Sequence, residues 1–458
     1  MKVTQSHIAL PVTSHISEVG LRARRRIAWR LLPFALLLYT VAYLDRVNVS
    51  FANLRMSADL GFSDTVYGLG VAVFYAGYVL FEVPGSIIVE RWSARKWIAR
   101  ILISWGFVTV LSGFVHTSGQ FYATRFLLGV AEASFFPGMI VYLARWFRVS
   151  DRARAISVFY TAIPMSFIIG SPLAGWLLGI GWLGLSGWRW MFILEGIPAI
   201  VLGFVTLSYL TDHPSQARWL DPEERDWITR ELELEKQAKA ETSNYTIWQA
   251  FRDRRILQLM VAFPLIATGT LSVFFWLPTF IKRLSGLPNA SVTLLAALPA
   301  VAGLAGLILN GWHSDKSGER RWHIVVPLVG AGITYLLLIP ASADFRIAMP
   351  LFIVGGFFIQ AYYPAFWALP TMILSDSAAA ASYGLLNSVG MLGGFFGPYI
   401  IGYLSNRTNS FVSGFAVIGT CYLTGAAVIA GLKIRTPHSQ TSASVTGAAA
   451  GVALRPSV

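Results

Sequence analysis

Residues 311–321 read Gly-Trp-His-Ser-Asp-Lys-Ser-Gly-Glu-Arg-Arg and form a short charged stretch between two long apolar runs. In the first half of the chain, residues 85–96 read Gly-Ser-Ile-Ile-Val-Glu-Arg-Trp-Ser-Ala-Arg-Lys and occupy the same place between two such runs. Other marks repeat at the same offset of 226 or 227 residues. The matching marks are Gly85 with Gly311, Pro172 with Pro398, and Phe135-Phe-Pro137 with Tyr362-Tyr-Pro364. A near-constant offset indicates an internal repeat, so we expect two related halves. Gly85 and Gly311 are each expected to begin a turn at the end of the apolar run that precedes the charged stretch.

The composition places most of the chain in a lipid bilayer. Only 13% of the residues are charged and 55% are apolar, whereas about a quarter of an ordinary soluble domain is charged. A membrane-spanning helix needs about 20 predominantly apolar residues, and twelve runs in the chain meet that need. The expected spans are residues 31–53, 66–88, 98–116, 121–143, 155–179, 188–210, 256–281, 291–312, 324–341, 346–370, 378–404 and 411–433. The pattern predicts an all-α integral membrane protein with twelve transmembrane helices in two six-helix bundles, and it excludes a soluble enzyme.

The basic residues are distributed by side of the membrane. The chain has 36 Lys and Arg residues and a formal net charge of +13, and most of these residues fall in the segments on the side that holds both termini. Because positively charged segments stay in the cytoplasm, the N- and C-termini are predicted to be cytoplasmic and the protein to be a multi-pass protein of the inner (plasma) membrane. The orientation of the chain in the membrane therefore accounts for its basic charge. The lipid bilayer is the expected partner, and nucleic acid is excluded as a partner.

The polar stretch between the halves defines the expected domains. From Thr211 to Asp253 the residues are charged and helix-forming, and Asp221 before Pro222 is typical of a helix N-terminus. The expected domains are a cytoplasmic N-terminal segment (1–30), an N-terminal six-helix bundle (31–210), a cytoplasmic linker helix (211–253), a C-terminal six-helix bundle (254–435) and a disordered tail (436–458). Neither the histidines nor the single cysteine, Cys421, has the spacing of a metal site, so we expect no metal and no cofactor.

Several stretches resemble a known family of transporters. The stretch that begins at Gly311 is similar to the loop signature of the major facilitator superfamily. The stretches that resemble its anion:cation symporter family are Tyr43-Leu-Asp-Arg-Val-Asn-Val-Ser-Phe-Ala, Phe81-Glu-Val-Pro, Trp188-Arg-Trp-Met-Phe-Ile-Leu-Glu-Gly-Ile-Pro, Trp276-Leu-Pro and Trp312-His-Ser-Asp. That family includes bacterial permeases for galactonate and related sugar acids, tartrate, phthalate and aromatic acids, and the animal sialin and vesicular glutamate transporters. The resemblance implies organic-anion transport, usually coupled to protons in the bacterial members.

The resemblance also implies that the two loop motifs are gating loops, in which charges hold one conformation. In the first loop Glu90 replaces the usual Asp, and Ser93-Ala94 replaces its Gly. A carboxylate remains, so gating is expected to survive, while the turn geometry of this loop is left open. The expected gating residues are Glu90, Arg91, Arg95, Gly311, Asp315, Lys316, Gly318, Arg320 and Arg321.

Charged residues inside the spans are the first candidates for function. On insertion scales such a residue costs roughly 2.5 to 3.5 kcal/mol. Arg125 and Glu132 share one face of span 4 but are about 10 Å apart along the axis, which is too far for a direct ion pair. Asp45 and Arg46 are adjacent, so they must face different partners. We expect Arg46 or Arg125 to bind a substrate carboxylate, and Asp45 and Glu132 to carry protons. The resemblance implies the same roles, and the alternative is a structural ion-pair network that locks spans 1 and 4.

The second half has no acid or base deep in a span, so we expect it to provide neutral selectivity. On span 10, Gln360, Tyr363 and Trp367 are three and four residues apart, which places them on one face of a helix. The expected substrate-binding residues here are Gln360, Tyr363 and Trp367 on span 10 and Asn387 on span 11, with Tyr43, Tyr75 and Tyr78 as similar candidates in the first half. Packing is the alternative in a chain whose residues are 14% aromatic. In span 6, Glu195 is expected to form a structural ion pair.

The leading hypothesis is a secondary active transporter that imports a small organic acid anion, such as a sugar acid or hydroxy-dicarboxylate, by proton symport with alternating access. Its partners would be the anion and protons, and it would function as a monomer. A proton-coupled efflux antiporter is one alternative, which Gly170-Ser-Pro-x-x-Gly175 suggests. An anion exchanger or uniporter is a second. A membrane sensor that transports nothing is disfavoured, because the linker and tail are too short for a signalling domain.

Overall fold

The computed structural model describes the backbone of residues 18–242, 253–373 and 376–432. Within these ranges, the side chains of residues 90, 153, 238–242, 370–373 and 376–384 lie outside the description. The described residues contain helices, turns and short connections, and no strand occurs among them. The predicted all-α class is confirmed.

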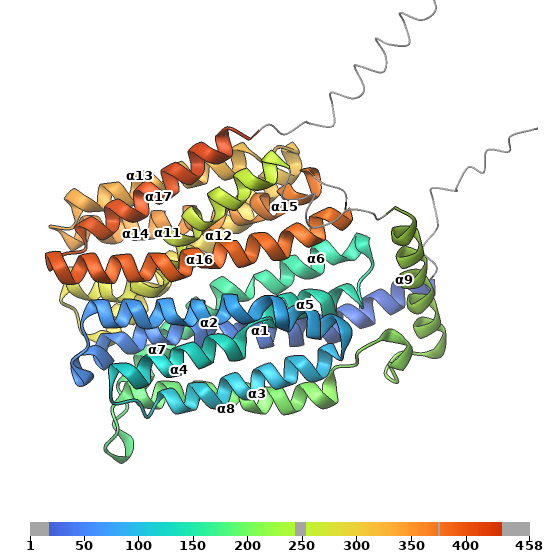
Figure 1. Cartoon of the computed structure of the whole chain (residues 1–458), viewed down its shortest axis with the longest axis horizontal. Helices are drawn as coiled ribbons and strands as arrows, with labels where there is room; N and C mark the ends of the chain where they lie inside the picture. Colours follow the sequence, from blue (N-terminus) through green and yellow to red (C-terminus); the bar gives the residue numbers. More distant parts are fainter. Residues whose placement is uncertain (1–17, 243–252, 374–375, 433–458) are drawn as a thin grey trace, which may run out of the picture. The chain divides into compact units, whose positions relative to one another are not determined.

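Eleven helical segments of the described chain are long and apolar enough to cross a membrane. They correspond to eleven of the twelve expected spans. The third expected span coincides with α3 (Ala94–Ser112), whose first two turns carry Arg95, Lys96 and Arg100. Along its length α3 packs against α8 (Gly187–Tyr209), which is one of the eleven (Figure 1). Because α3 has only 19 residues, these three basic residues lie within the stretch that would cross the membrane.

The chain folds as two compact units. Unit 1 contains the described parts of residues 1–60 and 73–243, and unit 2 contains those of 61–72 and 244–458. Besides α3 and α8, the helices assigned wholly to unit 1 are α1 (Glu18–Leu60), α4 (Ser118–Glu132), α5 (Phe135–Ala144), α6 (Val149–Tyr160), α7 (Ala162–Leu178) and α9 (Pro222–Thr242). Those of unit 2 are α11 (Arg254–Ser285), α12 (Asn289–Ser317), α13 (Trp322–Ala341), α14 (Phe345–Ala361), α15 (Tyr363–Ile373), α16 (Asp376–Thr408) and α17 (Val412–Ala430).

Helix α2 (Asp64–Arg91) begins in unit 2 and continues in unit 1. In unit 2 its first residue, Asp64, pairs with Arg283 of α11 and accepts a hydrogen bond from Ser405 of α16 (2.6 Å). The expected bundle boundaries at 31–210 and 254–435 stay predictions.

Three expected spans are each broken into two helices. The breaks lie at Ala133–Ser134, Thr161 and Tyr362, and each precedes a proline by two to four residues. Proline lacks an N–H group, and its ring clashes with the carbonyl group four residues earlier, so a continuous helix is disrupted at that point. Two of these prolines, Pro137 and Pro364, belong to the repeated Phe-Phe-Pro and Tyr-Tyr-Pro marks. The repeat therefore places a discontinuous helix at equivalent positions in the two halves.

Gly85 and Gly311 each lie where a helix passes close to one of these breaks, at Ala133–Ser134 and at Tyr362 respectively. A Cβ atom on Gly85 would overlap the Ser134 hydroxyl group, and one on Gly311 would lie 3.2 Å from Pro364 Cγ. The expectation that these glycines begin turns is wrong, because they lie inside α2 and α12. A glycine is needed at each position because the backbones of α2 and α12 pass close to the broken helix that packs against them.

Close helix packing by glycine also repeats. A Cβ atom on Gly129 of α4 would overlap the carbonyl group of Phe74 on α2, and one on Gly356 of α14 would overlap that of Pro299 on α12. These two glycines are 227 residues apart, the same offset as the other marks. Small residues at such crossings let membrane helices approach closely, so the halves share an architecture as well as a motif.

Helix α9 is the described part of the linker, and residues 243–252 lie outside the description. It packs on unit 1 through ion pairs: Arg26 to Glu224 (2.7 Å) and Arg148 to Glu231 (3.2 Å). Glu224 also accepts a hydrogen bond from the backbone N–H of Asp221, as in a capping box (3.2 Å). The linker helix is therefore part of unit 1, and ion pairs hold it to the rest of that unit.

Candidate functional site

The centre of unit 1 contains a buried ion pair between α1 and α4. Arg46 donates from Nε to Glu132 Oε1 (2.9 Å), and its Nη2 donates to the same oxygen at a shorter distance. The two side chains are 6% and 1% exposed, so water screens the pair little. The other oxygen of Glu132, Oε2, is buried and has no hydrogen-bond partner in the described part of the chain. The two oxygens of Glu132 thus have different environments: Oε1 accepts from a cation, whereas Oε2 has no partner among the described residues and is free to take a proton.

The helix break determines the position of Glu132. Glu132 is the last residue of α4, and Ser134 follows in the left-handed conformation with φ of 67°. A helix C-terminus carries partial negative charge and disfavours a carboxylate. The sequence placed this residue in the middle of a continuous span, so this effect was not expected. Arg46 compensates the unfavourable terminus only while it faces Glu132.

Asp45 faces away from that pair, as the adjacent positions of Asp45 and Arg46 predicted. Its carboxylate accepts hydrogen bonds from Thr109 Oγ1 on α3 (2.7 Å) and from Asn48 Nδ2 (2.9 Å). These donors are neutral, and a hydroxyl group can reverse its role and accept from a protonated acid. The surroundings of Asp45 therefore suit both charge states. Sequence reasoning missed Thr109, because an isolated threonine in an apolar span carries no signal.

Arg125 lies two turns before Glu132 on α4 and is 1% exposed. Its guanidinium group lies over the ring of Phe74 (4.8 Å to the centroid) and acts electrostatically on both Asp45 and Glu132. The same ring lies 5.8 Å from the Arg46 guanidinium group. Phe74 thus touches both cations, a contact that the sequence could not distinguish from ordinary aromatic packing.

The three tyrosine candidates of the first half gather at this cluster. The Tyr43 and Tyr78 rings lie 4.9 and 5.3 Å from the Arg46 guanidinium group. Tyr75 packs edge-on against Phe74, with the ring centroids 5.1 Å apart. The structure brings these side chains together with Arg46, and their contact with a substrate stays a prediction.

Glu195 on α8 belongs to the same region. Its carboxyl group is close enough to Asp45 to interact with it, and Asn48 hydrogen-bonds both acids. A close crossing brings α8 there, because a Cβ atom on Gly196 would lie 2.7 Å from the carbonyl oxygen of Gly106 on α3. Oε2 of Glu195 has no hydrogen-bond partner, and no basic group lies within 4.0 Å of the carboxylate in the part of the chain that the structure describes. The expected structural ion pair of Glu195 is therefore absent among the described residues.

The candidates of the second half lie in unit 2, on either side of the break at Tyr362. Gln360 is on α14, packed against Gly303 of α12, whereas Tyr363 and Trp367 are on α15. The three-and-four spacing therefore does not run along one continuous helix. Tyr363 stacks on Tyr362 (4.7 Å), Trp367 packs edge-on against Phe263 (5.3 Å), and Asn387 is buried on α16.

A polar group that the sequence did not single out lies beside them. Thr270 on α11 shares a hydrogen bond with the Tyr422 hydroxyl group (2.9 Å), and both residues are buried. Like Thr109, Thr270 gives no signal in an apolar span.

The first loop motif covers the end of α2 and the start of α3. The Ser93 hydroxyl group and the Arg95 backbone N–H both donate to Asp212, at 2.6 and 3.0 Å, and the Arg95 side chain lies 3.9 Å from it. Ser93 also caps the helix by accepting from Lys96 N. The replacement of glycine by Ser93-Ala94 thus yields a capped helix start. Arg91 is exposed, and the side chain of Glu90 lies outside the described residues.

The second loop motif ends α12. Gly318 stops the helix in the left-handed conformation, with φ of 67°, which favours glycine. Asp315 pairs with Arg320 at 2.6 Å, the Lys316 ammonium group lies 5.2 Å from the Trp312 ring, and Arg321 donates to the Leu432 carbonyl oxygen at 3.2 Å. The motif residues are therefore in contact within unit 2, and their role in gating stays a prediction.

Comparison with known proteins identifies the family. The model of the Major Facilitator Superfamily matches residues 35–398, with a second match over residues 285–457. The chain belongs to the Major Facilitator Superfamily. It is accordingly a multi-pass membrane protein and a secondary transporter, not an enzyme.

Relatives and solved structures agree with this Major Facilitator Superfamily assignment. A protein of Agrobacterium vitis named "Putative tartrate transporter" is 42% identical over 92% of this chain and 97% of its own length. A "Quinolone resistance transporter" of Acinetobacter baumannii is 35% identical over 88% of this chain and 92% of its own length. A crystal structure of a D-xylose-proton symporter matches 90% of this chain and 98% of that chain with a TM-score of 0.69, at 17% identity, and so shares the fold.

Proposed function

We propose that this transporter imports a small organic acid anion by proton symport, as a member of the anion:cation symporter branch. The single observation that carries the proposal is the buried Arg46–Glu132 pair, in which one carboxylate oxygen takes both guanidinium donors. An arginine in such a place binds a carboxylate with charge-assisted hydrogen bonds. The substrate carboxylate is of the same chemical kind as Glu132 and competes with it for Arg46.

Protonation of Glu132 decides that competition. A proton on the open oxygen Oε2 removes the charge that holds Arg46 and leaves the guanidinium group available to an anion. The C-terminal end of α4 favours the neutral acid, because it is the negative end of the helix dipole. Proton binding and anion binding therefore support each other, which is what symport requires.

Asp45 is proposed as a second proton carrier. Its hydrogen-bond partners, Thr109 and Asn48, are neutral and are compatible with both the ionised and the protonated acid. Arg125 is within electrostatic range of it. An anion that enters beside Arg125 therefore changes the field at Asp45 and at Glu132 together. Arg125 is assigned the second end of the substrate or its charge, and the neutral candidates of unit 2 are assigned to selectivity.

The substrate class is proposed from the chemistry of the cluster and the named relatives. Two guanidinium groups and several tyrosines suit an acid that also carries hydroxyl groups, and the relative at 42% identity is named for tartrate. We therefore propose hydroxylated dicarboxylates and sugar acids as the first acids to test.

The test uses purified protein in liposomes with a trapped pH-sensitive dye and no initial pH gradient. Each candidate acid is added outside, and protein-free liposomes correct for passive entry. Acidification of the lumen by one acid supports symport and identifies the substrate. If no acid moves protons while loaded vesicles exchange labelled anion, the protein is an exchanger or uniporter and the roles of Asp45 and Glu132 in proton coupling are wrong.

Efflux by proton antiport remains the second candidate, since one relative at 35% identity is named for quinolone resistance. The same vesicles decide between the two. An inward-directed proton gradient drives accumulation of the acid in a symporter, whereas an antiporter releases protons from an acidic lumen when its substrate is added outside.

A further inference from the structure

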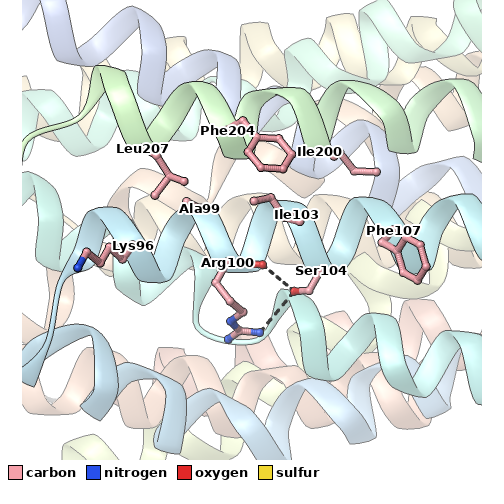
Figure 2. A pocket seen from close by; sticks show the side chains of 9 residues that line it. All are labelled: Lys96, Ala99, Arg100, Ile103, Ser104, Phe107, Ile200, Phe204 and Leu207. Atoms are coloured by element: carbon pink, nitrogen blue, oxygen red, sulfur yellow. Dashed lines mark hydrogen bonds between the residues drawn. The ribbon is translucent and has the colours of Figure 1, made fainter.

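A groove of about 530 Å³ runs along the face of unit 1 that α3 and α8 form together (Figure 2). It is lined by Lys96, Ala99, Arg100, Ile103, Ser104 and Phe107 of α3 and by Ile200, Phe204 and Leu207 of α8. Phe107 and Phe204 are 57% and 60% exposed. Large apolar side chains exposed on membrane helices face lipid, so this groove opens to the bilayer.

Glycines at the crossing of the two helices make the groove a fixed feature. A Cβ atom on Gly106 would lie 2.6 Å from the carbonyl oxygen of Gly196, and one on Gly203 would lie 2.5 Å from Ile103 Cγ1. The helix backbones are therefore in contact beneath the groove, while the side chains on either side project outward. Ala99, 1% exposed, is the small residue in the floor.

The groove has a basic end, where α3 begins. Arg95, in the same turn, is neutralised by Asp212. Lys96 and Arg100, by contrast, have no carboxylate within 4.0 Å in the described part of the chain. Their cations lie over tryptophan rings instead, Lys96 Nζ 5.8 Å from Trp92 and Arg100 4.0 Å from Trp97.

Arg100 is incompletely satisfied at that depth. Its Nε is buried without a hydrogen-bond partner in the described part of the chain, and its Nη1 donates a long hydrogen bond to the Ser104 hydroxyl group at 3.5 Å (Figure 2). It lies six residues into α3, about 9 Å along the axis at 1.5 Å per residue, a distance that a guanidinium group covers by extending toward the headgroups. A donor group of this kind beside a second cation, at the membrane interface, fits a phosphate.

We propose that the groove binds an anionic glycerophospholipid of the cytoplasmic leaflet. One acyl chain lies along the apolar part between Phe107 and Phe204, and the phosphate contacts Lys96 and Arg100. The predicted orientation puts this end of α3 on the cytoplasmic side, where basic pockets between membrane helices bind acidic headgroups. The proposal concerns lipid binding alone and does not depend on the transported substrate.

The charge of the site gives the size of the expected preference. Each Lys or Arg near an anionic surface contributes about 1 kcal/mol. Two such residues correspond to a roughly thirtyfold preference for phosphatidylglycerol over phosphatidylethanolamine, about 2 kcal/mol at 1.4 kcal/mol per factor of ten.

The test is native mass spectrometry of the full chain in detergent, titrated with each of these two lipids carrying identical acyl chains. We expect the wild type to retain phosphatidylglycerol preferentially and a Lys96→Gln, Arg100→Gln double variant to lose that preference. The matched control is Lys316→Gln with Arg321→Gln, because these two cations also lie over tryptophan rings, each at 5.2 Å, but do not line the groove.

Equal binding of both lipids to the wild type would overturn the proposal, and so would a preference that the double variant keeps or the control pair also loses. The occupant is identified with a photo-reactive phenylalanine analogue at position 204 in phosphatidylglycerol-containing membranes. A lipid adduct supports the proposal. A crosslinked dimer would instead mean that a second copy of the chain covers the groove, and the absence of any adduct would mean that no chain lies there.

Discussion

Replacing Glu132 with glutamine is expected to separate anion transport from proton movement. Glutamine is nearly isosteric and keeps an oxygen where Glu132 Oε1 accepts from Arg46 Nε at 2.9 Å. It removes the negative charge and the carboxyl group that takes the proton. The variant therefore imitates the protonated state permanently, and we expect exchange of anion to continue.

The burial of the pair sets the magnitude. With side chains 6% and 1% exposed, Arg46 and Glu132 form a buried ion pair, and removing one partner of such a pair costs about 3 to 5 kcal/mol. A substrate carboxylate restores the lost charge on Arg46. At a pH where wild-type Glu132 is ionised, the lower figure corresponds to a roughly hundredfold gain in anion affinity at 1.4 kcal/mol per factor of ten. The accumulation that this proton drives, about tenfold for each unit of pH gradient, is lost.

Three measurements on reconstituted protein check the expectation: acid-driven acidification of the lumen, counterflow of labelled anion, and anion affinity against pH. The matched control is Glu224→Gln. Glu224 is also a buried glutamate, 1% exposed and 2.7 Å from an arginine, Arg26, but it lies on the linker helix α9. The control should keep wild-type coupling and wild-type affinity.

Proton-driven accumulation in Glu132→Gln at the wild-type level would refute the proton role. If accumulation is lost but anion affinity is unchanged and still depends on pH as in the wild type, the competition for Arg46 is refuted and Glu132 acts by another route. Loss of both accumulation and exchange, in protein that is folded by its melting curve, would favour the structural ion-pair network.

Three further changes test the site and its support. Arg125→Lys keeps the charge but loses the planar fork, so the KM for the anion should rise about tenfold or more in uptake assays; an unchanged KM would count against a bidentate contact. Gly129→Ala adds a Cβ atom that overlaps the Phe74 carbonyl group, which should cost about 1 to 3 kcal/mol and lower the melting temperature. Gly119→Ala on the same helix, with its nearest atom 4.0 Å away, is the control, and equal melting temperatures would contradict the packing argument. Glu195→Gln should shift the external pH of half-maximal proton-driven uptake while exchange stays at the wild-type rate, because Glu195 lies beside Asp45 and has no basic partner among the residues that the structure describes; an unmoved pH profile would assign Glu195 a purely structural role.

The neighbours of the candidate residues show where sequence reasoning stops. Periodicity separated Asp45 from Arg46, and the structure agrees, because Arg46 donates to Glu132 while Asp45 accepts from Thr109. It treated the proline after Glu132 as part of a continuous span. The break at Ala133–Ser134 instead puts Glu132 at a helix end, which changes the electrostatics of its carboxylate.

Polar partners were the hardest to predict. Thr109 and Glu195 lie on α3 and α8, far in sequence from Asp45, and they meet it because glycines let those helices cross closely. Phe74 is one of many aromatic residues in the chain, and its contact with both arginines depends on how α1, α2 and α4 are rotated. None of these contacts leaves a local pattern.

The sequence by itself determined the helical class, the long membrane spans, the internal repeat and the ionisable residues worth testing. These properties follow from the length of apolar runs and the high cost of a charge in lipid, both of which are local. Only the tertiary structure decided that Arg46 pairs with Glu132, that Asp45 is held by neutral donors, and that Glu195 lacks a basic partner among the described residues. Such pairings depend on the rotation, crossing and breaks of helices that are distant in sequence, and these are set by packing between helices.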